Sequence, residues 1–327
     1  MRGLISCAVT LVTCIGAALP LTAAAQPYPA RPIKVVLPFP AGSATDGSAR
    51  LIAEELRKKL GQPIIIENQA GADGQLAAQA VKRAAPDGYT VILGNWTSHV
   101  GTPALYPIQQ DVLKDFEPVA RLPISRLWLT GKTGLPAKDA AELVAWLKAN
   151  PHKASFGTVG AGSAVHICGI YLQNSTGTQF QFVPYRGAAP AYQDQIAGNI
   201  DLTCMDASAG LGYHRSGRIK AYAVAGNGRW SPAPEVPTLS EAGVAGLDLT
   251  FWNGLWAPKG TPKEAVAKLN QAVADAFADA RMQQRIGDLG MEIPPRDQQT
   301  PEALGAYHRA ETEKWWPIIK AAGIKLE

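Results

Sequence analysis

The sequence of 327 residues has four cysteines, little net charge and no run of four Lys or Arg residues. None of the cysteines forms a CxxC pair, and neither an HExxH motif nor a Cys/His cluster occurs. We therefore expect no metal site and no cofactor. The formal net charge of +4 is small for a chain of this size, so nucleic acid is not an expected partner.

Long apolar runs are also absent, except at the N-terminus, where residues 4–19 are uncharged. A short positive start precedes this run and three alanines at 23–25 follow it, which is the pattern of a secretory signal peptide. The run is shorter than the ~20 residues of a membrane span. We predict a signal peptide over residues 1–25, cleavage near Ala25 and a periplasmic mature chain. A retained N-terminal anchor is the alternative.

Cleavage there would leave two cysteines, Cys168 and Cys204. In an oxidising compartment the two side chains could form a bridge. Because one lies in a predicted helix and the other in a predicted strand, we favour two separate buried thiols. The disulfide remains the alternative.

Beyond the signal peptide, short apolar runs typical of β-strands alternate with amphipathic helical patterns. Strands are predicted at residues 33–38, 62–67, 89–93, 154–157, 179–185, 200–205 and 219–225. Helices are predicted at residues 46–60, 75–84, 138–150, 164–175, 188–198, 262–286 and 301–322. Such alternation indicates an α/β fold with a buried, mostly parallel sheet.

The alternation is interrupted twice, by extended residues at 116–130 and at 250–258. A chain of this length is expected to form roughly two domains of ~150 residues. We therefore predict two α/β lobes joined by two crossings. The first lobe comprises residues 26–123 with 250–327, and the second comprises residues 124–249.

Small and polar residues follow the predicted strands, at the sheet edge where open α/β sheets bind ligands. The segments are residues 39–46, 68–74, 95–99, 158–163, 186–188 and 206–208. Small residues ahead of a helix expose backbone N–H groups at the positive end of the helix dipole, which suits a carboxylate or a phosphate. The alternative is that these residues only cap helices, with Thr45, Ser163 and Ser208 as the caps.

Nucleotide and hydrolase motifs are incomplete. No loop ends in the Gly-Lys-Ser/Thr of a P-loop, and Val165 stands where a dinucleotide fingerprint would place its third glycine. Residues 206–210 lack the leading glycine of a nucleophile elbow. An exported α/β hydrolase or esterase is kept as an alternative, since the partners of a catalytic triad are distant in sequence.

Many short segments together resemble one family. They are residues 28–33, 38–42, 46–50, 60–63, 67–68, 85–90, 103–106, 115–120, 183–187 and 321–326. In this order they are similar to the Bug, or TctC-type, extracytoplasmic receptors of tripartite tricarboxylate transporters. The resemblance covers essentially the whole mature chain, and no single motif carries it.

The resemblance implies a type II-like periplasmic-binding-protein architecture with two lobes and no catalysis. It implies a monomeric receptor that captures a small carboxylate between the lobes and delivers it to membrane permease subunits. A ligand-sensing subunit for a membrane kinase would use the same fold and is the alternative.

In the family, the loop after the first strand holds one carboxylate through backbone N–H groups and small hydroxyls, and loops of both lobes contribute. With the other residues of the loops that follow the strands, the predicted ligand-binding residues are Phe39, Ala41, Gly42, Ser43, Ala44, Asp46, Gly71, Trp96, Thr97, Ser98, Thr158, Gly160, Ser163, His166, Arg186 and Asp206. Asp206 corresponds to an acid at the edge of the pocket.

The sequence departs from the family pattern at three places. Ser43 follows Gly42 where the family has paired glycines, and Asp73 stands where glycine is frequent. Trp96 is larger than the residues common after the third strand. It either packs inside the lobe or lines the cleft, where it would stack on a flat ring and favour an aromatic acid such as a terephthalate-like diacid.

Overall fold

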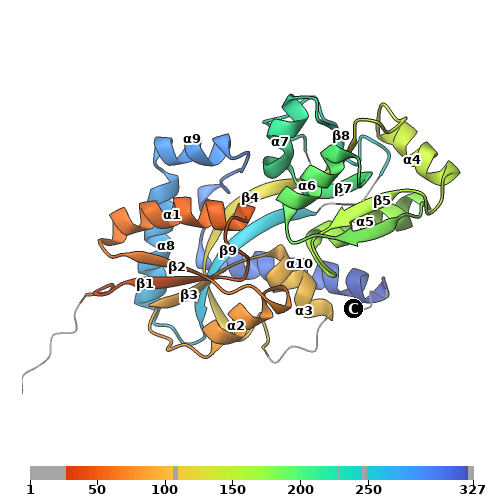
Figure 1. Ribbon diagram of the computed structural model, residues 1–327. Helices are drawn as coiled ribbons and strands as arrows, with labels where there is room; N and C mark the ends of the chain where they lie inside the picture. Colours follow the sequence, from red (N-terminus) through yellow and green to blue (C-terminus); the bar gives the residue numbers. More distant parts are fainter. Residues whose placement is uncertain (1–26, 106–109, 227, 245–246, 248, 323–327) are drawn as a thin grey trace, which may run out of the picture.

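Figure 1 shows the computed structural model, which describes residues 27–105, 110–226, 228–244, 247 and 249–322, apart from the side chains of Ala44 and Asp73. The predicted signal peptide and the side chain of Asp73 lie outside the described residues. Within the described residues, no helix is both long and apolar enough to cross a membrane.

The strands form one nine-stranded sheet with the order β2-β1-β3-β9-β4-β7-β5-β6, and β8 pairs with β4 beside this path. The strands are β1 Ile33–Leu37, β2 Ile64–Asn68, β3 Thr90–Asn95, β4 Phe116–Lys132, β5 Ser155–Thr158, β6 Gln181–Pro184, β7 Leu202–Asp206, β8 Ile219–Val224 and β9 Thr250–Pro258. Every predicted extended segment is confirmed within two residues at each end. The α/β class is therefore confirmed.

The two crossings are β4 and β9, which lie side by side and antiparallel between the two halves of the sheet (Figure 1). Each half is parallel, with β1 between β2 and β3 in one and β5 between β6 and β7 in the other. The first part of β4 pairs with β9 and the second part with β7 and β8. The long strand β4 thus pairs with strands of both halves of the sheet.

The helices are α1 Ala44–Leu60, α2 Gln75–Lys82, α3 Thr102–Leu105, α4 Ala140–Ala149, α5 Ala164–Thr176, α6 Ala188–Ala197, α7 Ala207–Arg215, α8 Lys263–Phe277, α9 Ala280–Asp288 and α10 Pro301–Ala321, with short turns η1 Ala72–Gly74, η2 Thr97–Gly101 and η3 Arg296–Gln298. Six of the predicted helices are found at their positions, the one over residues 262–286 is divided, and α3 and α7 have no counterpart among the predicted ranges. The prediction of one continuous helix over residues 262–286 is wrong, because α8 and α9 are separate helices. The side chain of Asp279 accepts a hydrogen bond from the N–H of Met282 and starts a new helix there.

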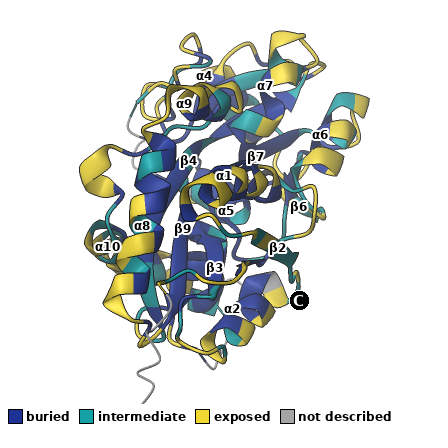
Figure 2. Cartoon of the chain, turned by 90° about the vertical axis from the view of Figure 1, so that its left-hand side faces the viewer, coloured by how far each residue is buried: buried dark blue, intermediate teal, exposed yellow. Residues whose placement is uncertain are grey.

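Both faces of the first half of the sheet are covered, as continuous apolar strands require. Ile33, Val35 and Leu37 of β1 point into a core shared with α1, α8 and α9. Val36 points to the other face, into a core shared with α2 and α10. Figure 2 shows the central strands as buried, the edge strands β2 and β6 as only partly buried, and the outer helix faces as exposed.

The second of these cores continues from the first lobe into the second. Trp96 and Val100 belong to it from the first lobe, and Ala164 and Val165 belong to it from the second. One apolar core therefore extends through both lobes and includes residues of the two crossing strands.

Cys168 of α5 and Cys204 of β7 form a disulfide, with 6.2 Å between their Cα atoms. Our prediction of two separate thiols is wrong at this point. The two residues are 36 positions apart, and only the packing of α5 against β7 brings their side chains together. The bridge fixes the helix that follows the loop at residues 158–163.

Candidate functional site

The parallel strands of each half end at one edge, where the predicted site loops begin. The loop after β3, in the first lobe, touches the start of α5, in the second. The hydroxyl oxygen of Thr97 accepts a hydrogen bond from the N–H of Ala164 at 3.3 Å. This hydrogen bond places Thr97, a predicted site residue of the first lobe, next to the loop that ends at Ser163 in the second.

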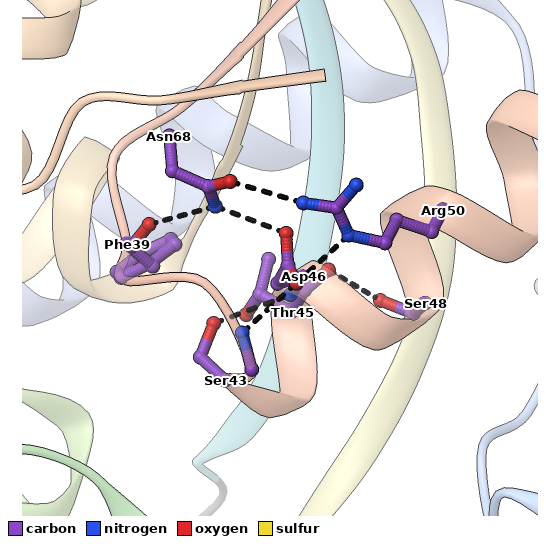
Figure 3. Close-up of polar contacts among 8 residues, drawn as sticks. Phe39, Ser43, Thr45, Asp46, Ser48, Arg50 and Asn68 are labelled. Atoms are coloured by element: carbon purple, nitrogen blue, oxygen red, sulfur yellow. Dashed lines mark hydrogen bonds and ion pairs between the residues drawn. The ribbon is translucent and has the colours of Figure 1, made fainter.

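The loop between β1 and α1 is organised by the carboxylate of Asp46 (Figure 3). One oxygen, Oδ2, accepts hydrogen bonds from the N–H of Gly42 at 2.9 Å and from Nε of Arg50 at 3.0 Å. The other, Oδ1, accepts from Nδ2 of Asn68 at 3.0 Å. The same amide group also donates to the carbonyl of Phe39, so it links β2 to this loop.

Asp46 is nearly buried, with 5% of its side chain exposed, and remains ionised. Burial alone would raise the pKa of its carboxyl, but the hydrogen bonds from Arg50, Gly42 and Asn68 outweigh it and hold the pKa below the usual value. Its oxygens are occupied by these donors. Asp46 therefore stabilises the loop from inside. The sequence instead predicts it among the ligand contacts.

The surface of this loop is formed by small residues. Ala41 and Gly42 are exposed, and Phe39 and Ser43 are half-buried. Gly42 has a φ of +80°, which favours glycine, and open space beside its Cα. Ser43 caps α1 by accepting a hydrogen bond from the N–H of Asp46, so the cap predicted at Thr45 is wrong. Ala44 is the first residue of α1.

The loops after β2 and β3 pack tightly beneath the first loop. Gly71 and Gly74 have φ values of +138° and +94°, and a Cβ at Gly74 would lie 2.9 Å from the Cβ atoms of Pro38 and Ser98. The hydroxyl of Ser98 is buried and donates to the carbonyl of Asn95. Ser98 therefore supports the loop and does not present its hydroxyl at the surface.

Trp96 is fully buried and packs edge-to-face on Trp315, with 5.6 Å between the ring centroids. Its ring also lies 2.6 Å from where a Cβ on Gly101 would stand. Of the two alternatives for Trp96, the structure shows the first, in which the ring packs inside the lobe. The ring offers no exposed face for stacking.

The loop after β5 in the second lobe repeats the design of the first. Thr158 ends the strand and is buried, and Gly160 has a φ of +111°. The hydroxyl of Ser163 donates to the carbonyl of Gly160 at 2.8 Å and accepts from the N–H of His166 at 3.1 Å. The cap predicted at Ser163 is confirmed.

His166 is a neutral side chain that holds the same loop. Burial lowers the pKa of its imidazole below the usual value. Its Nδ1 accepts a hydrogen bond from the N–H of Gly162 at 3.2 Å, which places the remaining proton on Nε2. The ring edge therefore provides one further neutral donor at this loop.

Asp206 is buried between β7 and the first crossing strand. Its Oδ2 accepts from the hydroxyl of Ser125 at 2.8 Å, and its Oδ1 accepts from the N–H and hydroxyl of Ser208. Burial outweighs these hydrogen bonds and raises the pKa of the carboxyl. Asp206, not Ser208, caps α7, so that predicted cap is wrong. The Ser208 hydroxyl bonds to this carboxylate rather than to a histidine, which leaves the esterase alternative without its nucleophile–base pair.

Arg186 differs from the other predicted site residues because it is charged, exposed and unpaired. It follows β6 and makes no hydrogen bond or ion pair with any residue that the structure describes. The sequence did not single out Ser125. It placed Asn68 and the turn Thr97–Gly101 in or beside the site loops, without the supporting contacts that they make. For a supporting role, Asn68 alone carried a signal, as an amide at the end of a strand.

Comparisons with known proteins agree on the class. A family profile described as the tripartite tricarboxylate transporter family receptor, TctC, matches residues 48–324. MatC of Rhodopseudomonas palustris, solved with bound malate, is 37% identical with a TM-score of 0.83, and the match covers 89% of this chain and 100% of that one. Rpa4515 of R. palustris, solved with adipate, is 31% identical with a TM-score of 0.84, over 92% and 100%. The periplasmic binding protein BugD is 35% identical with a TM-score of 0.84, over 92% and 100%.

The fold and these matches define a two-lobe solute-binding receptor rather than an enzyme. The chain belongs to the TctC, or Bug, family of tripartite tricarboxylate transporter receptors. Receptors of this family are periplasmic.

Proposed function

We propose that this protein captures a small dicarboxylate between its two lobes and delivers it to the permease subunits of a tripartite tricarboxylate transporter. The observation that carries the proposal is the pair of loops at residues 39–43 and 159–163. Each is rich in small residues, each precedes a helix N-terminus, and each lacks a cationic side chain of its own. Backbone N–H groups at helix N-termini favour a carboxylate without a full positive charge.

The ligand class follows from chemistry and from relatives. Malate and adipate, which MatC and Rpa4515 hold, are both small aliphatic dicarboxylates. The aromatic diacid is not favoured for this chain, because the buried ring of Trp96 removes its stacking surface. Two carboxylates match two donor loops, one in each lobe.

The contacts within this site are proposed as two groups. Backbone at Ala41, which is exposed, and at Gly160, which is half-buried, would face the ligand, with Arg186 at the edge. The N–H of Gly42 already donates to Asp46, so Gly42 would give the ligand room rather than a hydrogen bond. Asp46 and Asp206 would act indirectly, because their oxygens are occupied by neighbouring donors. The remaining predicted residues would support the loops.

The lobe boundaries at residues 123 and 250 are proposed as the hinge. The pairing of β4 with β9 shifts register between Leu122 and Ser125, and β9 begins at Thr250. A break in a regular ladder is a place where two strands can change direction together. The mature chain that begins after Ala25 would thus close about these two strands as a monomer in the periplasm.

A thermal-shift titration with malate and adipate tests the function. A ligand at 100 times its Kd adds ~2.7 kcal/mol to the free energy of unfolding, so we expect a clear rise in Tm with at least one of the two acids. A neutral sugar of similar size is the control and should leave Tm unchanged. A rise with sugars alone would contradict the proposal.

A further inference from the structure

The turn Thr97–Gly101 of the first lobe packs backbone against backbone on the second lobe. A Cβ on Gly101 would overlap the carbonyl oxygen of Gly162. In the other direction, a Cβ on Gly162 would overlap the side chain of Leu105. No side chain separates the two backbone segments at this point, so the lobes approach as closely as their backbones allow.

A hydrogen bond lies beside this contact. The first N–H groups of a helix have no acceptor within the helix. Ala164 is the first residue of α5, and its N–H donates to the hydroxyl oxygen of Thr97, a residue of the other lobe. The second lobe therefore completes its helix cap with an acceptor from the first.

On the side of the first lobe, the contact is backed by buried residues. Gly101 is buried, and the ring of Trp96 lies directly behind it, fixed against Trp315. A rigid aromatic wall behind a glycine leaves that glycine no room to retreat. The position of the turn is therefore set by the core of the first lobe.

We infer that Gly101, Gly162 and Thr97 form the closing contact of the receptor, with Thr97 as a positioning residue of the closed state. The inference rests on the proposed function, because closing matters only if a ligand lies between the lobes. When the lobes separate, the Ala164 N–H loses Thr97 and is left to water. Closing restores that hydrogen bond next to the loop that would hold the ligand.

A consequence is that the glycines set how near the lobes approach. Any side chain at position 101 would meet the Gly162 carbonyl on one side and Trp96 on the other. Neither the backbone nor the packed ring can move aside cheaply. A methyl group there would hold the lobes apart and leave a ligand partly open to water.

The first test is Gly101→Ala, with Gly212→Ala as the matched control, since an added Cβ at Gly212 meets nothing within 4 Å. We expect Gly101→Ala to raise the Kd for malate or adipate at least tenfold by calorimetry. Small-angle scattering should show that saturating ligand no longer makes this variant more compact. Gly212→Ala should bind and contract as the wild type does. A Gly101→Ala protein that binds and contracts normally would overturn the inference.

The second test uses Thr97, in case Gly101→Ala does not fold. Thr97→Val keeps the shape and removes the acceptor, whereas Thr97→Ser keeps the acceptor. We expect ligand to dissociate about fivefold faster from the valine variant, as the loss of one hydrogen bond of ~1 kcal/mol predicts, and at the wild-type rate from the serine variant. Equal rates in the two variants would show that the hydroxyl has no role in closure.

A ligand-free experiment separates this inference from the proposed function. Cysteines at both positions, Thr97→Cys with Ala164→Cys, would cross-link the lobes in the closed state. The cross-linked protein should have a smaller radius of gyration than ligand-free wild type, whichever acid is the ligand. Equal radii would mean that the contact exists in every state and is no closing contact. Failure of the wild type to bind any dicarboxylate would instead refute the proposed function.

Discussion

Arg186 is the one predicted site residue that carries a positive charge, and it has no partner among the described residues. Exposed, unpaired arginines add little to stability because water already solvates them. A free guanidinium at the end of β6 is instead available to a ligand carboxylate. Its contribution should therefore be visible in affinity alone.

Arg186→Gln should weaken dicarboxylate binding about fivefold, or ~1 kcal/mol, as expected for a partly exposed ion pair. Calorimetric titration measures the loss, and Tm without ligand should not change. Arg83→Gln is the control, because Arg83 is also exposed, has no described ion pair and lies at the far end of α2. Equal affinities of both variants and wild type would remove Arg186 from the site.

Asp206 affects stability through its buried charge. Its folded pKa is raised, because burial disfavours the ionised form. The unfolded carboxyl ionises first as pH rises, near its usual pKa of 3.8. At pH values between this pKa and the raised pKa of the folded state, the free energy of unfolding of the wild type decreases as pH rises.

Asp206→Asn should remove this pH dependence, since the amide carries no charge. The free energy of unfolding of the variant, relative to wild type, should increase as pH rises above about 4 and then level off. Urea unfolding across this pH range measures the difference. A constant difference at all pH values would show that Asp206 titrates normally in the folded protein.

At the scale of elements, the strands follow from the sequence because each is a short apolar run bounded by Gly, Pro or polar residues. Short turns and caps were less predictable. The turn Thr97–Gly101 contains no helical periodicity, and the break between α8 and α9 depends on one Asp279 side chain. The caps were misplaced at Thr45 and Ser208, because several adjacent residues could cap equally well and backbone geometry decides among them.

For the site, too, the position of the loops could be predicted and the orientation of their residues could not. The sequence located the loops, because the carboxyl ends of parallel strands share an edge. It did not separate residues that face outward, such as Gly42, from residues that face inward, such as Asp46 and Trp96. That distinction depends on hydrogen bonds from Arg50 and Asn68 to Asp46 and on packing of Trp96 against Trp315. Asn68 and Trp315 are distant from these loops in sequence, and the orientation of the nearby Arg50 is set only in the folded loop.

The disulfide between α5 and β7 should stabilise the second lobe. The two cysteines are 36 positions apart, and closing a loop of this length lowers the entropy of the unfolded chain, which corresponds to about 4 kcal/mol. We expect a reductant to lower the free energy of unfolding of wild type by about this amount in urea titrations. The double variant Cys168→Ser with Cys204→Ser should unfold at the reduced midpoint with or without reductant. A wild type insensitive to reductant would contradict the stabilising role.

At the scale of the whole molecule, the lobes are linked by more than β4 and β9. The segment after α9 pairs with the first crossing strand through two backbone hydrogen bonds between Ile124 and Glu292. The indole N–H of Trp230, in the second lobe, donates to the carbonyl of Gly290 at 3.0 Å. If the lobes close about the proposed hinge, they would turn around these contacts while the sheet-end loops travel further.

The central claim is that a dicarboxylate lies between the sheet-end loops of the two lobes. A crystal structure of the protein with malate or adipate tests it most directly. We predict one carboxylate against the backbone at residues 41–43 and the other against residues 159–162, with Thr97 bonded to the N–H of Ala164. A ligand found elsewhere would contradict the account, for instance in the hollow of about 700 Å³ that Phe277, Ile286 and Arg296 help to line.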